Sequence, residues 1–146
     1  MKPTYIEFQE EYLDDVINFY IGYYNSKGGK WTYEKAYKRI HQITTMEDSL
    51  VILQFDEKKF VGFLMGYFKC FDDSTGFYVE EILVSSDFQH KGYGSDFLQH
   101  LKSELKNNNC DWIELLTTTE TLHQNFYSKN GYTQSKNLVL EFVDLN

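Results

Sequence analysis

Two apolar runs separated by four charged residues constrain the fold of this chain more than any other feature. The first run, residues 50–55, reads LVILQF, and the second, residues 60–68, reads FVGFLMGYF. The DEKK sequence between them is typical of a solvated turn, so the pair predicts an antiparallel hairpin. The longest apolar stretch, residues 61–68, is far shorter than the roughly 20 residues that span a bilayer. The runs are therefore expected to be strands of a buried sheet.

The rest of the chain alternates between helical and strand patterns. Hairpin-linked strands come first and strand-helix-strand crossovers later, which predicts an α+β domain. We expect a mixed, mostly antiparallel sheet of about seven strands flanked by about four helices, in the order β-α-α-β-β-β-α-β-α-β-β. The expected strands are 4–8, 50–55, 60–68, 77–84, 112–116 and 138–143, and the expected helices are 12–23, 32–42, 91–106 and 121–130, the last of them ended by Gly131.

Composition limits the size and the partners of this domain. The chain has 146 residues, 42% of them hydrophobic, which predicts one domain over residues 1–146. Fourteen Lys and Arg against 22 Asp and Glu give a net charge of −8, which argues against a nucleic acid or an anionic membrane as partner. A cationic small molecule fits this field better. The start of the chain lacks a long apolar leader segment, so we expect a cytoplasmic protein.

Cysteine and histidine patterns indicate neither a disulfide framework nor a metal site. Cys70 and Cys110 have no CxxC spacing, and both are expected to be free thiols. The four histidines show no spacing that places ligands on one face, so no structural or catalytic metal is predicted. The cysteines also lack a histidine at a spacing typical of a nucleophilic pair, which favours direct chemistry over a covalent intermediate.

The segment from residue 82 to residue 94, ILVSSDFQHKGYG, predicts an anion site. A buried strand runs through a short loop into the start of an amphipathic helix. The first N–H groups of a helix and the positive end of its dipole bind phosphate, and glycines at 92 and 94 let a ligand approach the backbone. The third glycine of a dinucleotide-binding loop is absent, because Phe97 occupies its position.

Two motifs in this chain resemble those of the GNAT superfamily of acetyl-CoA-dependent N-acetyltransferases. Gln89-x-x-Gly92-x-Gly94 is similar to the pyrophosphate loop of that family, and residues 126–132, FYSKNGY, look like its Tyr-x-x-x-Gly-Phe/Tyr signature. The expected element order also resembles the GNAT (acyl-CoA N-acyltransferase) fold. The resemblance implies acetyl-CoA as the acetyl-donor cosubstrate and a small-molecule amine as acceptor. Because GNAT-like proteins often dimerise, it also leaves a homodimer open.

The resemblance assigns the cofactor contacts by position. Backbone groups of the strand are expected to pair with the pantetheine arm and those of the loop with the pyrophosphate. Lysine side chains would supply the positive charge. Glu120 and His123 replace an Asn and an Ala that many members carry, and Asn125 is a candidate substitute. The expected contacts are Ile82, Leu83, Val84, Gln89, His90, Lys91, Gly92, Tyr93, Gly94 and Asn125, with Lys129 or Lys136 as further phosphate partners.

Acetyl transfer to an amine requires a base and an acid. An alkylamine with a pKa of around 10.4 is protonated at pH 7, so a group must remove its proton. The departing thiolate needs a proton in return, and the resemblance implies Tyr127 as its donor. For the base we rank Glu80 first, Glu81 second and Glu114 third. Because neighbouring strand side chains point to opposite faces, we expect only one of Glu80 and Glu81 to face the acceptor.

Residue positions also bear on the acceptor. Glu80 is expected to share a face with Ile82 and Val84. VEE at 79–81 with NFY at 125–127 is similar to the diamine and polyamine acetyltransferase branch, where a strand carboxylate is the proposed base, usually acting through water. Aromatic residues of the first two helices, with Trp31 and Tyr24 as the candidates for substrate contact, suit a cationic amine. The alternative acceptors are an aminoglycoside, an amino acid or a protein N-terminus. The alternative function is that of a non-catalytic coenzyme-A-binding sensor.

Overall fold

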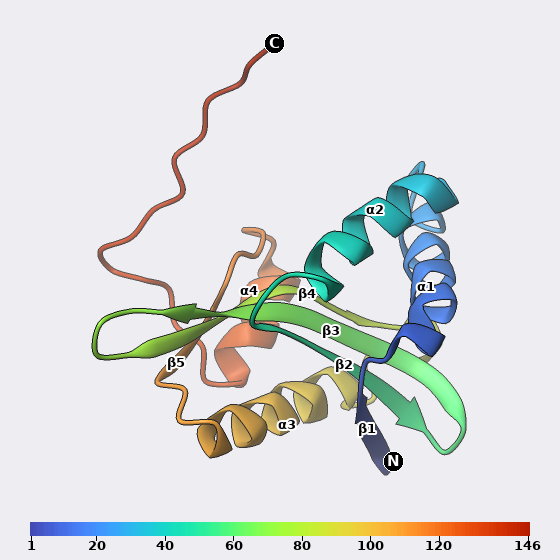
Figure 1. The fold of residues 1–146 in the computed structure, drawn as a ribbon, viewed down its shortest axis with the longest axis horizontal. Coiled ribbons are helices and arrows are strands. Elements are labelled where there is room, and N and C mark those ends of the chain that lie inside the picture. Colours follow the sequence, from blue (N-terminus) through green and yellow to red (C-terminus); the bar gives the residue numbers. More distant parts are fainter. The chain divides into compact units, whose positions relative to one another are not determined.

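The computed structural model describes all 146 residues, which form two units, Met1–Leu116 and Thr117–Asn146. The first unit is a five-stranded sheet in the order β1-β2-β3-β4-β5, with helices on both faces (Figure 1). The pairs β1-β2, β2-β3 and β3-β4 are antiparallel, and β4-β5 is parallel. The elements are β1 (Pro3–Glu7), α1 (Leu13–Asn25), α2 (Tyr33–Thr44), β2 (Ser49–Asp56), β3 (Lys59–Cys70), β4 (Thr75–Val84), α3 (Tyr93–Asn107) and β5 (Trp112–Leu115), with short 3₁₀ turns at Glu10–Tyr12 and Ser86–Phe88.

Strand alternation produces two apolar layers, one on each face of the sheet. On β2, Val51 and Leu53 pack with residues of α1 and α2, whereas Leu50 and Ile52 pack with residues of α3. The same alternation continues on β3. Successive side chains point to opposite faces, so a continuous apolar run predicts a strand buried on both sides. The expected hairpin and α+β class are confirmed.

A bulge interrupts this alternation on β4. Met65 of β3 pairs with Glu81 and Gly66 pairs with Val79, so Glu80 is an extra residue with no partner on β3. Before the bulge, Val79 packs in the α3 layer; after it, Leu83 packs in the layer formed with α1 and α2. One extra residue shifts the period of two by one position, and side chains beyond it change face.

The second unit contains one helix, α4 (Thr121–Lys129). Gly131 follows it with φ of +90°, the left-handed conformation expected at a helix end. Residues 133–146 form no strand, so the expected strand over 138–143 and the count of about seven strands are wrong. An alternating apolar segment becomes a strand only when a neighbouring strand accepts its backbone hydrogen bonds, and here the side chains are exposed, Val139 at 84% and Phe142 at 85%.

None of the helices combines the length and the apolar character needed to cross a membrane.

Candidate active site

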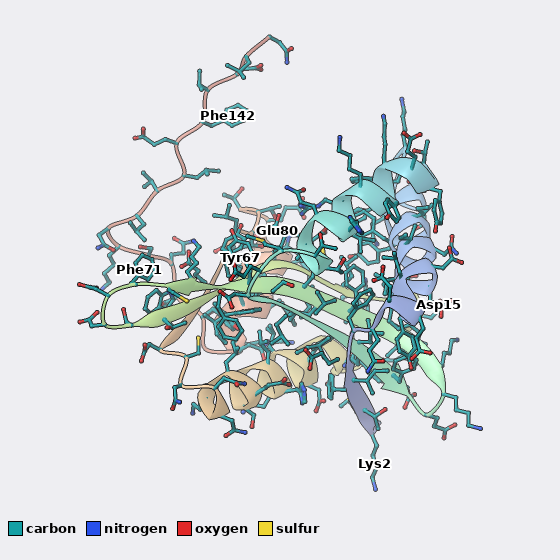
Figure 2. The ribbon with its side chains drawn as sticks, viewed as in Figure 1. Lys2, Asp15, Tyr67, Phe71, Glu80 and Phe142 are labelled. Atoms are coloured by element: carbon teal, nitrogen blue, oxygen red, sulfur yellow. The ribbon has the colours of Figure 1, made fainter.

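Two neighbouring carboxylates of β4 meet one arginine of α2. Arg39 Nη1 lies 2.8 Å from Glu80 Oε1, and Arg39 Nη2 lies 3.5 Å from Glu81 Oε2. Figure 2 shows Glu80 on the face of the sheet that α2 covers. A guanidinium presents its donors in a planar fork, which lets one side chain serve both acids. The result is a compact cluster of Glu80, Glu81 and Arg39, called the carboxylate cluster below.

The bulge explains why both acids reach the same arginine. The expectation that only one of them faces the helices α1 and α2 is wrong, because the extra residue brings Glu80 and Glu81 to the same face. The expected face shared by Glu80, Ile82 and Val84 is wrong for the same reason. Ile82 packs with the α3 layer, and Val84 packs with Val61 and Tyr93.

Glu81 is the more enclosed of the two acids, with a side chain 9% exposed against 21% for Glu80. Its Oε1 accepts a hydrogen bond from the Tyr24 hydroxyl of α1. Its Oε2 is buried and makes no hydrogen bond, only the ion pair with Arg39. A buried carboxylate oxygen without a donor is costly in a folded protein, and such atoms concentrate at sites that bind or react.

The groups around Glu81 hold fixed protonation states. Burial, followed by the hydrogen bond to Glu81, raises the pKa of Tyr24, so its phenol remains a donor. Burial and then Glu81 also raise the pKa of Tyr20. Burial lowers the pKa of Arg39, but its hydrogen bonds to Glu80 and Tyr20 and the charges of both acids outweigh that effect, and its pKa is raised overall. Arg39 is a permanent cation.

Aromatic side chains close one side of the cluster. Trp31 packs edge-on against Tyr20 at a centroid distance of 4.9 Å, and Tyr24 lies 4.7 Å from Tyr20. The Asn25 side chain holds the loop between α1 and α2 by two hydrogen bonds of 2.9 Å to the backbone of Trp31. The two residues expected to contact the acceptor, Trp31 and Tyr24, thus belong to one aromatic wall that includes Tyr20.

The loop between β4 and α3, predicted as an anion site, contains two residues in the left-handed conformation. His90 has φ of +60° and Gly92 has φ of +93°, so two left-handed residues turn the chain into the 15-residue helix α3. The first four N–H groups of a helix have no acceptor within it, and the dipole there favours negative charge. Gln89 Nε2 donates to Val84 O at 2.9 Å and braces the loop against the end of β4.

One edge of β4 lacks a neighbouring strand beside this loop. β5 pairs with β4 only from Gly76 to Val79, while β3 pairs with the other edge up to Val84. The second edge of residues 80–84 therefore offers backbone groups to an extended ligand, in the way that an exposed sheet edge receives an added strand. The cofactor backbone contacts expected at Ile82 and Leu83 would lie on this edge.

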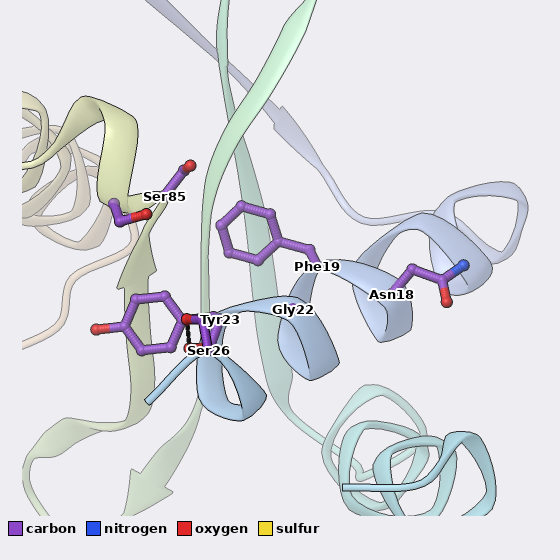
Figure 3. A pocket seen from close by; sticks show the side chains of 7 residues that line it. Asn18, Phe19, Gly22, Tyr23, Ser26 and Ser85 are labelled. Carbon is purple, nitrogen blue, oxygen red and sulfur yellow. Dashed lines mark hydrogen bonds between the residues drawn. The ribbon is translucent and has the colours of Figure 1, made fainter. Parts of the chain in front are cut away.

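A pocket of about 280 Å³ adjoins the loop (Figure 3). Burial raises the pKa of Tyr23 in this pocket, and the nearby Gln89 side chain opposes part of the shift. The pocket therefore brings α1 against the loop that precedes α3. Its lining residues are Asn18, Phe19, Gly22, Tyr23, Ser26, Ser85 and Ser86.

Three expected site side chains have other partners. Tyr93 is 5% exposed, and its hydroxyl donates to Asp56 Oδ2 at 2.8 Å, so only its backbone is available to a phosphate. Lys91 Nζ donates to the backbone oxygen of Asp87 at 2.9 Å. Glu114 of β5, the third candidate base, pairs with Lys69 of β3 at 3.2 Å and is not part of the carboxylate cluster.

The second unit holds the candidate acid. Tyr127 lies on α4, where its ring packs against Phe126 and Tyr132 at centroid distances of 5.0 and 5.7 Å. Asn125 is exposed on the same helix, and Glu120 precedes it without a capping side-chain hydrogen bond. The roles of Tyr127 and Asn125 stay predictions.

Arg39 is the member of the carboxylate cluster that sequence reasoning did not predict. A signal for it existed: Ala36, Ile40 and Ile43 form the buried stripe of α2, and position 39 lies beside that stripe at helical spacing.

The cysteines stay outside the site. Cys70 is exposed, and burial raises the pKa of the Cys110 thiol. No group of three or more His, Cys, Asp or Glu side chains is placed to hold a metal ion.

Comparisons with known proteins identify the family of this chain. The Acetyltransferase (GNAT) domain family matches residues 47–134, more than half of the chain. A search of curated protein sequences gives no significant match. A GNAT family acetyltransferase from Staphylococcus aureus superposes with a TM-score of 0.77 at 21% identity, covering 98% of this chain and 100% of that one.

Two further solved structures share the fold. An aminoglycoside acetyltransferase from an uncultured soil metagenomic sample, in complex with sisomicin, gives a TM-score of 0.76 at 13% identity, covering 99% of this chain and 97% of that one. AAC(6′)-Iy in complex with a bisubstrate analog, CoA-S-monomethyl-acetylneamine, gives 0.77 at 11% identity, covering 99% of both chains. At these identities the structures establish the fold, and the domain match establishes the family. The chain belongs to the GNAT acetyltransferase family, as an acetyl-CoA-dependent N-acetyltransferase.

Proposed function

We propose that this enzyme transfers acetyl directly from acetyl-CoA to the primary amine of a small cationic acceptor. The observation that carries the proposal is the buried Glu81 carboxylate, with one oxygen held by Tyr24 and the other without a hydrogen bond. A carboxylate beside an aromatic wall attracts an ammonium group, and Glu81, whose Oε2 pairs with Arg39 at 3.5 Å, can receive the proton that the ammonium must lose before it attacks.

On the donor side, the loop and the strand edge support binding of coenzyme A. The N–H groups from Gln89 to Gly94 would hold the pyrophosphate, and backbone groups of Ile82, Leu83 and Val84 would pair with the pantetheine arm. Gly92 accommodates this approach, because the atoms nearest to a Cβ added there belong to the flexible side chain of Met1, at 3.5 Å. The thioester supplies the activated acetyl group.

The reaction balances with two proton transfers. The neutral amine attacks the thioester carbonyl carbon, a C–N bond forms and the C–S bond breaks. Glu81 takes the proton of the amine, directly or through water, and the Tyr127 phenol gives a proton to the departing thiolate. We place Glu81 ahead of Glu80 as base, because the closest contact of Arg39, at 2.8 Å, is to Glu80. The exposed Cys70 and the high pKa of Cys110 favour this direct route.

Two kinds of acceptor fit this chemistry. Polyamine-like molecules agree with the VEE triplet at 79–81, and an aminoglycoside is the other candidate, because one solved structure of the same fold is an aminoglycoside acetyltransferase in complex with sisomicin. Both classes carry primary amines among further positive charges, which a surface with a net charge of −8 attracts. An amino acid or a protein N-terminus is the alternative acceptor, and a coenzyme-A-binding sensor is the alternative outside catalysis.

The test is release of free thiol from acetyl-CoA by the purified protein, with and without polyamines, aminoglycosides, amino acids and peptides. We expect release that depends on one class of cationic amine. Saturable acetyl-CoA binding with no release across the panel would favour the sensor.

Variants then assign the roles. Glu81→Gln should lower kcat/KM for the amine by about 100-fold or more, the range of general-base catalysis, with Glu80→Gln lower in effect and Glu114→Gln close to wild type. Tyr127→Phe should lower kcat and leave acetyl-CoA binding unchanged. Equal turnover by Tyr127→Phe and wild type would remove Tyr127 from the mechanism.

A further inference from the structure

We propose that Arg39 is a specificity residue that limits the number of positive charges the acceptor site accepts. The inference rests on the proposed function, because it takes the carboxylate cluster as the place where the acceptor ammonium binds. It deepens that function by naming the residue that sets how strongly the cluster attracts a second positive charge on the acceptor.

The argument begins with a count of charges. The carboxylate cluster contains two acids and one guanidinium, so its formal net charge is −1. The hydroxyl groups that face it, from Tyr20 and Tyr24, are neutral. Lys69 and Glu114, on the neighbouring strands β3 and β5, pair with each other at 3.2 Å and add no net charge. One ammonium neutralises the cluster, and a second one brings an excess positive charge.

Ion pairs with both acids hold the Arg39 guanidinium in the cluster. Its Nη1 and Nη2 atoms contact a different acid each, at 2.8 and 3.5 Å, and its side chain is only 27% exposed. Removing one partner from a partly buried ion pair leaves uncompensated charge, so a bound amine adds to the cluster instead of replacing the guanidinium. Glu81 Oε2, which pairs with Arg39 at 3.5 Å, is the carboxylate oxygen of the cluster that makes no hydrogen bond.

The charge of Arg39 should therefore change the preference for diamines over monoamines. Removing the charge of Arg39 changes the cluster from −1 to −2, which strengthens the attraction for each further positive charge on the acceptor. Diamines should gain relative to monoamines of equal length. The gain should be roughly tenfold, as expected for one charge at a distance of several ångströms in a partly exposed site.

The experiment compares 1,4-diaminobutane with 4-amino-1-butanol, which carries a hydroxyl in place of the second ammonium. The ratio of the two kcat/KM values is measured for wild type, Arg39→Gln and Arg39→Lys. Because both substrates meet the same protein, losses of folded protein or of acetyl-CoA binding cancel in the ratio. We expect the ratio to rise about tenfold in Arg39→Gln and to stay within about twofold of wild type in Arg39→Lys, which keeps the charge.

Each other outcome overturns the inference or separates it from the proposed function. An unchanged ratio in Arg39→Gln overturns it, and so does an equal rise in both variants. If the wild-type enzyme acetylates neither amine, this choice of acceptor fails, and calorimetric binding of the two amines to the same three proteins decides the role of Arg39. A rise in the diamine-to-aminobutanol affinity ratio in Arg39→Gln alone then supports it; no rise, or no binding of either amine, overturns it.

Discussion

The Tyr24 hydroxyl of α1 donates a hydrogen bond to the Glu81 carboxylate of β4, across 57 residues of sequence. The contact ties a helix beside the sheet to the strand that carries both acids. It fixes Glu81 Oε1, whereas the buried Oε2 makes no hydrogen bond and pairs with Arg39 at 3.5 Å. Because burial and the carboxylate raise the pKa of Tyr24, the phenol keeps its proton throughout the neutral range.

Tyr24→Phe should therefore impair the acceptor half of the reaction. Loss of a hydrogen bond to a charged group corresponds to about 1.5–3 kcal/mol, so kcat/KM for the amine should fall roughly tenfold or more, with KM for acetyl-CoA unchanged. Tyr33→Phe is the matched control, since the Tyr33 hydroxyl donates to Asp14 Oδ1 at 2.7 Å on the exposed surface. Steady-state kinetics measure both, and equal activity of the two variants would contradict the role given to Tyr24.

Sequence patterns predicted the strands and helices of the first unit, because period and turn chemistry are local properties. The bulge at Glu80 could not be predicted in the same way. It depends on how β3 and β4 pair, with Met65 opposite Glu81 and Gly66 opposite Val79, and one strand alone carries no record of its partner's register. The candidate site follows the same division: the anion loop is a prediction from local residues, whereas the Arg39 contact with the two acids arises from tertiary structure.

The strand expected over 138–143 is an element that the sequence pattern predicts and the structure lacks. Its alternating apolar residues satisfy the local pattern, but β propensity measures how well a side chain fits a sheet surface that must already exist. Residues 133–146 contain no strand.

Gly92→Ala should weaken coenzyme A binding through the backbone of the anion loop. Gly92 has φ of +93°, and an alanine there costs about 1 kcal/mol or shifts the loop amides. Misplaced donors to the pyrophosphate should raise the Kd for coenzyme A about tenfold in calorimetry. Gly28→Ala is matched in conformation, with φ of +91°, and should lose similar stability but keep its affinity. Equal Kd values for the two variants would place the pyrophosphate elsewhere.

Gly66→Ala should destabilise the sheet at the bulge. A Cβ on Gly66 would lie 2.2 Å from the backbone oxygen of Tyr78 and 2.7 Å from the Phe77 ring, so the two strands must separate. We expect a loss of about 3 kcal/mol or more in the free energy of unfolding, measured with urea. Gly22→Ala, where nothing lies within 4 Å in the helix α1, should instead be neutral or stabilise by up to about 1 kcal/mol. A small loss at Gly66 would mean that the bulge can relax.

Alkaline pH should destabilise the fold through buried tyrosines. Burial, followed by the charge effect of Tyr127, raises the pKa of Tyr132 to about 12 from an ordinary value of 10. Above pH 10 the unfolded chain therefore binds fewer protons than the folded one, and stability falls until the folded phenol also ionises near pH 12. The contribution of protonated Tyr132 to the free energy of unfolding is fully present below pH 10 and is lost as pH rises from 10 to 12.

Tyr132→Phe should flatten this decline. The Tyr132 hydroxyl is buried without a hydrogen-bond partner, so its removal should cost little or nothing at pH 7. Denaturant unfolding at pH 7, 9, 10.5 and 11.5 measures the difference, with Tyr37→Phe as the control because Tyr37 is 38% exposed. Some decline should remain in Tyr132→Phe, since burial raises the pKa of Tyr5 and Tyr20 as well. Parallel pH profiles for Tyr132→Phe and wild type would show that Tyr132 ionises in the folded state as easily as in the unfolded one.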